Sequence, residues 1–261
     1  MRQVSVGTRG NRVAFDERSG PRWRRRIERQ QPMARPVLLV HGWGGSYATT
    51  WKAPGWDMLL GDIGKTDIIG VDLLGHGTAP KPHDPAEYAD LGSRIVDALP
   101  AEPVDAIGFS LGAITLLHTA TQHPDRFRRI VLAGIGNGLL DPDPTAPSRA
   151  DAIAAAMRGD GDSADNWAQA MSRHAQQPGN DPDALIAVLR RPMPADPVTR
   201  ESCQRVSAKV LVCIGEKDFA GPADALAAAL PDATLKVLKN TDHFATPEAF
   251  GFIDAVLTFL G

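Results

Sequence analysis

"GFSLGA", which runs from Gly108 to Ala113, lies between a strand-like segment, "PVDAI" (103–107), and a helix-like segment, "ITLLHTATQ" (114–122). Glycines on both sides of a serine permit a sharp turn from a strand into a helix, because they place no β-carbon against the neighbouring backbone. Such a turn exposes the hydroxyl of Ser110 at the carboxyl edge of a sheet, where the helix dipole favours negative charge. A serine helix cap between two glycines would have the same local sequence. The rest of the chain has to distinguish these two interpretations.

Apolar runs alternate with longer segments of helical spacing, which predicts βαβ units and a mostly parallel sheet flanked by helices. The expected strands are Val37–Val40, Asp67–Val71, Val104–Ile107, Arg129–Ala133, Val210–Ile214 and Leu235–Leu238. The expected helices are Glu87–Leu99, Leu111–Gln122, Ala223–Leu230 and Pro247–Leu260, and an edge hairpin is expected at Val4–Val6 and Arg12–Phe15. The sequence therefore predicts the α/β class.

Residues 137–206 interrupt this alternation, because they contain no convincing strand. The proline-rich "DPDPTAP" (141–147) near their start can extend neither a helix nor a central strand. Helical spacing returns at Arg149–Arg158, Ser163–Gln176 and Pro182–Leu189. We expect residues 1–136 and 207–261 to form the α/β core, and residues 137–206 to form a helical lid over the sheet edge.

The composition is that of an ordinary globular protein, with a net charge of −3 over 261 residues. This balance excludes a general attraction to nucleic acid or to an anionic membrane. The sequence has neither a run of 18 apolar residues nor an apolar segment behind the first charges, so we expect no membrane span, no secretory signal and a cytoplasmic location. The oligomeric state stays open between monomer and dimer.

Cysteines and charged clusters give little sign of further chemistry. Cys203 and Cys213 are the only cysteines, and Cys213 lies in an apolar run that predicts a buried free thiol. No metal-binding spacing occurs, so we expect neither a metal nor a cofactor. The basic stretch Arg22–Gln30 is expected to form an exposed loop.

A serine hydroxyl becomes an effective nucleophile only when a base accepts its proton and a third group orients that base. His243 is the one histidine that follows the last expected strand and precedes the final helix, at the end of the sheet where open α/β folds bind ligands. The other candidates are His41 and His76 in turns after strands, His83 in a proline-rich loop, His118 and His123 near the helix after Ser110, and His174 in the lid. The sequence therefore predicts His243 as the base.

The carboxylate that orients this base should leave another strand at the same edge. Asp218 lies four residues beyond the expected strand Val210–Ile214 and meets this condition. Asp242 is a rival, although a direct sequence neighbour seldom directs its carboxylate at the next imidazole, and Glu216 is a second alternative. We expect Asp218 to orient His243.

Glycines also follow the first central strand, in "LLVHGWGG" (38–45). They allow backbone N–H groups to turn into the site, so the N–H groups of Trp43 and Leu111 are expected to form an oxyanion hole for a tetrahedral intermediate. We expect the imidazole of His41 to hold this loop. The similar turn "VDLLGHG" (71–77) is expected to act as scaffold.

Together these motifs resemble the α/β-hydrolase fold family over nearly the whole chain. They are "HGWGG" (41–45), "DLLGHG" (72–77), "GFSLG" (108–112), "GEKD" (215–218) and "DHF" (242–244), in the family's order. The resemblance implies a triad of Ser110, Asp218 and His243, with Trp43 and Leu111 as oxyanion residues. Two features depart from the family pattern: Thr78 stands where serine is common, and the arginine-rich stretch before Val37 is longer than usual.

Haloalkane dehalogenases and epoxide hydrolases of the family that this chain resembles carry an aspartate at this turn, whereas this chain carries Ser110. We therefore expect hydrolysis of a carboxylic ester of a small, largely apolar molecule through an acyl-enzyme. Trp43, Trp167 and Met171 are expected to bind this substrate, although the lid residues could equally form the lid's own core.

Three alternatives remain from the sequence. The same triad could hydrolyse a thioester, or cleave a C–C bond of a dienoate. Dienoate cleavage would need a basic lid residue for the substrate carboxylate, with Arg173, Arg190 and Arg191 as candidates. In the third alternative the protein is a small-molecule sensor that keeps the triad without turnover.

Overall fold

The computed structural model describes residues 35–141, 146–160, 162 and 165–261. Within them, six parallel strands form a sheet in the order β2-β1-β3-β4-β5-β6. The strands are β1 (Val37–Val40), β2 (Ile68–Val71), β3 (Val104–Phe109), β4 (Phe127–Ala133), β5 (Lys209–Gly215) and β6 (Ala233–Leu238). Each expected strand is confirmed to within two residues at either end. The expected hairpin and the basic stretch Arg22–Gln30 lie outside the described residues.

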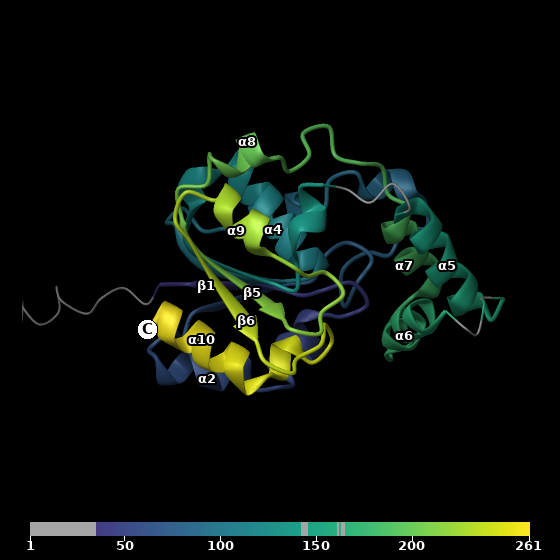
Figure 1. Cartoon of the computed structure of the whole chain (residues 1–261), viewed down its shortest axis with the longest axis horizontal. Helices are drawn as coiled ribbons and strands as arrows, with labels where there is room; N and C mark the ends of the chain where they lie inside the picture. The colour runs from purple at the N-terminus through teal and green to yellow at the C-terminus, as the bar shows by residue number, and fades with distance from the viewer. Residues whose placement is uncertain (1–34, 142–145, 161, 163–164) are drawn as a thin grey trace, which may run out of the picture. The chain divides into compact units, whose positions relative to one another are not determined.

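Helices cover both faces of the sheet (Figure 1). On one face lie α4 (Leu111–Gln122), α8 (Arg200–Cys203) and α9 (Asp224–Ala229), and on the other lie α2 (Trp56–Asp62) and α10 (Phe250–Leu260). Alternate residues of the central strands pack into two separate apolar clusters. In β1, for example, Leu38 and Val40 belong to the first cluster, whereas Val37 and Leu39 belong to the second. Burial on both faces explains why the strands read as continuous apolar runs.

The expected helix Glu87–Leu99 is wrong, because the chain forms two separate elements there. These are the 3-10 helix η2 (Pro85–Tyr88) and the short helix α3 (Ser93–Ala98). Between them, the carboxylate of Asp90 accepts a hydrogen bond from the Ser93 N–H at 3.0 Å, and the Ser93 hydroxyl donates to the Asp90 carbonyl at 3.1 Å. These local bonds compete with continued helical pairing and start a new helix at Ser93.

Other short elements lie in the connections. The final expected helix, Pro247–Leu260, divides into the 3-10 helix η5 (Thr246–Glu248) and α10. No expected helix corresponds to α2 or to the π-helical turn η1 (Tyr47–Lys52), which Ser46 and Thr49 cap reciprocally. The remaining 3-10 turns are η3 (Pro124–Arg126) and η4 (Asn137–Leu139). The described helices include none with the length and apolar character that a membrane span requires.

Residues 137–206, here called the β4–β5 segment, contain helices and no strand among their described residues. Before α8 they form α5 (Ala146–Arg158), α6 (Asn166–Ala175) and α7 (Pro182–Leu189). These three helices group at one end of the sheet (Figure 1), and α7 also packs against η2. Aspartate side chains cap the N-termini of two of these helices: Asp165 caps α6 and Asp181 caps α7.

Candidate active site

Ser110 joins β3 to α4 with a strained backbone, φ 50° and ψ −117°. Its side chain makes no helix-capping hydrogen bond, which argues against the simple cap interpretation. Packing explains both flanking glycines. A β-carbon at Gly108 would lie 2.7 Å from the Ala113 Cα, and one at Gly112 would collide with the carbonyl oxygen of Val40. The turn therefore depends on glycine at both positions.

Ser110, His243 and Asp218 form one hydrogen-bonded chain. The Nδ1 atom of His243 lies 2.8 and 3.0 Å from the two carboxylate oxygens of Asp218, and its Nε2 atom lies 2.9 Å from the Ser110 hydroxyl oxygen. A carboxylate only accepts, so Nδ1 carries the proton and Nε2 is left to accept from the serine. Asp218 follows β5 and His243 follows β6, and both side chains are buried.

Neither of the two alternative carboxylates hydrogen-bonds to the His243 imidazole. Asp242 is exposed and accepts a hydrogen bond from the Ala245 N–H at 2.9 Å. Glu216 is also exposed and accepts from the Asn240 N–H at 2.9 Å. The geometry therefore brings Asp218, and neither alternative, to the imidazole.

Residues Gly42–Gly45 form a tight turn beside Ser110. The Gly45 N–H donates to the Gly42 carbonyl at 3.1 Å, and a φ of 74° at Gly44 makes this a type II turn. A β-carbon at Gly42 would lie 3.2 Å from the Ser110 Cβ, so the turn packs directly on the serine. On the other side, Leu111 begins α4, where the first amides lack acceptors within the helix.

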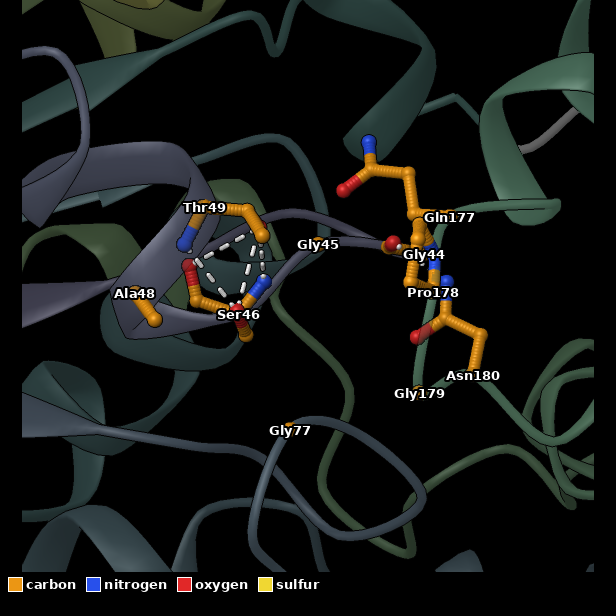
Figure 2. A pocket seen from close by; sticks show the side chains of 10 residues that line it. All are labelled: Gly44, Gly45, Ser46, Ala48, Thr49, Gly77, Gln177, Pro178, Gly179 and Asn180. Carbon is orange, nitrogen blue, oxygen red and sulfur yellow. Dashed lines mark hydrogen bonds between the residues drawn. The ribbon is translucent and has the colours of Figure 1, made fainter.

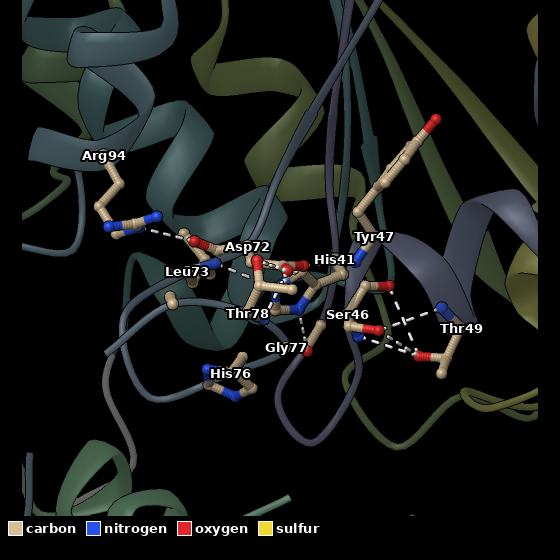
Figure 3. Close-up of polar contacts among 12 residues, drawn as sticks. His41, Ser46, Tyr47, Thr49, Asp72, Leu73, His76, Gly77, Thr78 and Arg94 are labelled. Carbon is tan, nitrogen blue, oxygen red and sulfur yellow. Dashed lines mark hydrogen bonds and ion pairs between the residues drawn. The ribbon is translucent and has the colours of Figure 1, made fainter. Parts of the chain in front are cut away.

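His41 holds this turn from inside the protein (Figure 3). Its Nε2 atom accepts from the Leu73 N–H at 3.0 Å, so its Nδ1 atom carries the proton and donates to the Gly42 carbonyl at 2.8 Å. Burial lowers the pKa of His41, in agreement with a neutral ring. Nearby, both the N–H and the hydroxyl of Thr78 donate to Asp72, which places Thr78 in this scaffold.

Two aromatic residues that the sequence analysis did not single out line the site. The ring of Phe219 lies 4.2 Å from the His243 ring and is 47% exposed. The ring of Phe244 lies 5.6 Å from His243 and 4.9 Å from the ring of His174 in α6. Phe219 and Phe244 directly follow Asp218 and His243 in the sequence, and that adjacency was an available signal.

The three residues expected to bind substrate differ in their surroundings. The Trp43 indole is buried and donates its Nε1–H to the Leu185 carbonyl at 3.0 Å. Trp167 is half-buried and meets the Phe219 ring edge-to-face at 5.9 Å, whereas Met171 is half-buried against the larger apolar cluster. Their roles in binding stay predictions.

Both cysteines are buried free thiols, which confirms the expectation for Cys213. Burial raises the pKa of Cys203 to about 11 and that of Cys213 to about 12, which suppresses thiolate chemistry. Over the described part of the chain, no group of three or more His, Cys, Asp or Glu side chains is placed to hold a metal ion.

The fold and this constellation define a class of protein. A sequence model of the alpha/beta hydrolase family matches residues 37–253. The chain therefore belongs to the alpha/beta hydrolase family.

Two curated relatives cover only part of the chain. The 2-hydroxymuconate semialdehyde hydrolase of a Pseudomonas species is 34% identical over 105 residues, which cover 38% of this chain and 36% of the relative. The pimeloyl-[acyl-carrier protein] methyl ester esterase of Neisseria meningitidis is 36% identical over 113 residues, which cover 42% of this chain and 40% of the relative. The chain thus matches about two-fifths of the length of these proteins.

Solved structures share the fold over most of the chain. An esterase from Thermogutta terrifontis has a TM-score of 0.65 at 20% identity and covers 86% of this chain and 89% of its own. A 2-hydroxy-6-oxo-6-phenylhexa-2,4-dienoate hydrolase from a Rhodococcus species has a TM-score of 0.59 at 19% identity, with 88% and 91% covered. At such identities the likeness establishes the fold alone.

Proposed function

We propose that the protein is a serine hydrolase that cleaves a carboxylic ester of a small, largely apolar molecule through an acyl-enzyme. The Ser110 oxygen attacks the ester carbonyl carbon while the Nε2 atom of His243 takes the hydroxyl proton. His243 then gives this proton to the departing alcohol. A water molecule attacks the acyl-serine with His243 again as the base, which releases the carboxylic acid and restores Ser110.

Asp218 and two backbone groups complete the proposed mechanism. The carboxylate of Asp218 keeps the proton on Nδ1 and stabilises the positive charge that His243 acquires. The N–H groups of Trp43 and Leu111 donate to the oxygen that becomes negative in the tetrahedral intermediate, and each such donor is worth about 3 kcal/mol of transition-state stabilisation.

One observation carries this proposal: the unbroken hydrogen-bonded chain from Ser110 through His243 to Asp218. The serine hydroxyl donates at 2.9 Å and the carboxylate accepts at 2.8 Å, which are distances suited to proton transfer. The strained backbone at Ser110 supports the same conclusion, because strain of this kind gathers at functional sites. Similarity to the Neisseria methyl ester esterase adds support for an ester substrate.

The β4–β5 segment is proposed as the lid that selects the substrate. Trp167 from α6 and Phe219 beside His243 form an aromatic pair between this segment and the serine. Such a pair suits an apolar acyl or alkyl group, because burying aromatic surface against it is favourable.

Ser110→Ala tests the proposed nucleophile. We expect the variant to lose turnover of p-nitrophenyl esters by roughly 10⁴-fold or more, and to lose labelling by a fluorophosphonate, because the attacking oxygen is gone. Steady-state rates and gel fluorescence measure the two effects, and thermal unfolding verifies the fold. Activity within tenfold of wild type would exclude Ser110 as the nucleophile.

Two matched acid variants test the orienting carboxylate. Asp218→Asn should lower kcat/KM by about 10⁴-fold, since an amide cannot hold the productive tautomer of His243. Asp242→Asn serves as the control, because its carboxylate only caps the Ala245 N–H. A larger loss in the control than in Asp218→Asn would show that the acid is Asp242.

A second candidate reaction is C–C bond hydrolysis of a dienoate, which the similarity to the Pseudomonas semialdehyde hydrolase favours. This reaction needs a cation for the substrate carboxylate. Arg190 is engaged with Asp151, whereas Arg191 is half-buried and donates to the Val188 carbonyl at 2.8 Å. Arg173 is exposed, so Arg191 is the one of the three candidates that is half-buried.

A substrate panel distinguishes the reactions. Purified protein would be given p-nitrophenyl esters, acyl-thioesters and a 2-hydroxy-6-oxo-dienoate, and rates would be compared with those of Ser110→Ala. We expect esters to have the highest kcat/KM. A higher value for the dienoate would establish C–C hydrolysis instead, and serine labelling without turnover of any substrate would support a sensor.

A further inference from the structure

The Gly42–Gly45 turn is held from two directions, and one of them is the β4–β5 segment. From the core, His41 and the Gly45 N–H both donate to the Gly42 carbonyl. In a trans peptide unit the N–H points opposite to the carbonyl, so these bonds direct the Trp43 N–H away from His41. The hydrogen bonds from His41 and from the Gly45 N–H do not reach the next two carbonyls, those of Trp43 and Gly44.

Asn180 binds one of these carbonyls. It lies in the loop between α6 and α7, and Figure 2 shows it beside Gly44. Its side-chain amide donates to the Gly44 carbonyl at 2.7 Å and to the carbonyl of Ala175, the last residue of α6, at 3.0 Å. One amide group therefore ties the turn to the end of α6.

His174 reaches the same turn from α6. A β-carbon at Gly44 would lie 3.0 Å from its Cδ2 atom, so the ring packs against the turn. The Trp43 side chain adds a third link, since its indole donates to Leu185 of α7. The β4–β5 segment therefore contacts this turn at both Trp43 and Gly44.

We propose that Asn180 is a positioning residue that holds the Gly42–Gly45 turn in the conformation in which the Trp43 N–H serves the oxyanion hole. The inference rests on the proposed function and adds to it that the hole is completed by the β4–β5 segment. The central peptide of a type II turn, here the one between Trp43 and Gly44, can flip. Loss of the Asn180 bond releases the Gly44 carbonyl, which directly follows this peptide. Displacement of a catalytic group by about 1 Å costs about 10²-fold in rate.

The expected signature is a loss of kcat without a matching change in KM. In Asn180→Ala we expect kcat on a small p-nitrophenyl ester to fall by about tenfold to 10²-fold, with KM within threefold of wild type, because the oxyanion forms only in the transition state. Affinity for a trifluoromethyl ketone, which forms a charged adduct on the serine, should fall in the same proportion. Asn180→Asp keeps the shape, cannot donate, and should lose at least as much.

Gln177→Ala is the matched control. Gln177 lines the same cavity of about 220 Å³ (Figure 2), precedes Asn180 in the same loop, and makes no hydrogen bond to the turn. It should keep kcat and inhibitor affinity within twofold of wild type. Equal losses in Gln177→Ala and Asn180→Ala, or an unchanged kcat in Asn180→Ala, would overturn the inference.

Hydrogen exchange separates this inference from the proposed function. The Gly45 amide should exchange faster in Asn180→Ala than in wild type, while the amides of α4 keep their protection and the thermal unfolding midpoint stays within a few degrees. Faster exchange in a protein that hydrolyses no ester would refute the proposed function and uphold the positioning role. Unchanged exchange at Gly45 would refute the positioning role, whatever the activity.

Discussion

At the scale of single residues, glycines decide whether the site can form. Gly112 lies where α4 crosses the end of β1, and a β-carbon there would meet the carbonyl oxygens of both Val40 and His41. Neither carbonyl can move without breaking the sheet or the hydrogen bond that His41 makes to the turn. The space beside Ser110 is thus set by contacts between backbones.

Gly112→Ala should therefore destabilise the protein by at least about 3 kcal/mol, the upper part of the range for overpacking. The control is Gly61→Ala, in α2, where no atom lies within 4 Å of the added carbon. That change should stabilise the protein by about 0.5–1 kcal/mol, because alanine loses less backbone entropy in a helix. Urea unfolding measures both, and equal effects would contradict the packing explanation.

The sequence predicted the residues of the hydrogen-bonded chain and missed some of those around it. Ser110, Asp218 and His243 each follow a strand, and parallel strands bring their carboxyl ends to one edge. His174 reaches the site from α6, and strand order carries no information on which side of a helix will meet the turn. Its place depends on tertiary packing, which no local pattern encodes.

At the scale of elements, a buried carboxylate ties β3 to its neighbours. Asp105 is fully buried near the start of β3 and bonds to Lys65, Arg128 and Arg129 at 2.7–3.2 Å. Burial alone would raise the pKa of Asp105, but the hydrogen bonds from Arg129 and Lys65 lower it. Arg129 also donates to the carbonyls of Phe259 and Leu260, so the cluster fixes the end of α10.

Asp105→Asn should lower the free energy of unfolding by about 3–5 kcal/mol, because three cations would lose the carboxylate that balances them. Asp57→Asn is a control, since its partner is the hydroxyl of Tyr47 rather than a cation. That variant should lose less than about 1.5 kcal/mol. Guanidinium unfolding at neutral pH measures both, and a loss under 1 kcal/mol in Asp105→Asn would refute this account of the cluster.

The proposed lid makes a prediction at the same scale. Trp167→Ala should change the preference among acyl chain lengths more than the rate on the smallest ester, because the indole lies against Phe219 near the serine. Met58→Ala, on the exposed surface of α2, should change neither. Steady-state kinetics on esters of two to ten carbons measures the preference, and a uniform loss on every ester would assign Trp167 to the lid core.

Helix boundaries were harder to predict than strands. Apolar spacing predicted one helix at Glu87–Leu99, yet Asp90 and Ser93 form local bonds that interrupt it. In α7, Asp181 caps the helix and Pro182 begins it, and the predicted bounds Pro182–Leu189 are confirmed. Apolar spacing thus predicted the ends of a helix correctly where the capping residues of the structure lie at the same positions.

At the scale of the whole molecule, buried histidines link stability to pH. Burial lowers the pKa of His76 to about 3 and also lowers the pKa of His41. In the unfolded chain both titrate near the ordinary value of about 6.5. Below that pH the unfolded state binds protons that the folded state does not, so stability is complete above about pH 6.5 and declines as the pH falls.

The free energy of unfolding should therefore fall by about 2 kcal/mol between about pH 7.5 and about pH 5 because of His76, and His41 should add to this fall. Urea titrations at several pH values measure the decline. His76→Gln should show a smaller decline, since the contribution of His76 is removed and that of His41 remains. A stability that stays level or rises toward about pH 5 would contradict the assignment.

The second apolar cluster has a consequence for synthesis on the ribosome. Trp51 and Trp56 belong to the first quarter of the described sequence, yet they share this cluster with Phe252, Val256 and Leu260 of α10. The Trp56 ring meets the Phe252 ring, and its indole donates to the Pro247 carbonyl. Until Leu260 leaves the exit tunnel, α10 cannot cover the indoles of Trp51 and Trp56. We expect the nascent chain to expose an apolar aromatic surface to chaperones until α10 has been synthesised, and to become protease-resistant only after α10 has left the tunnel.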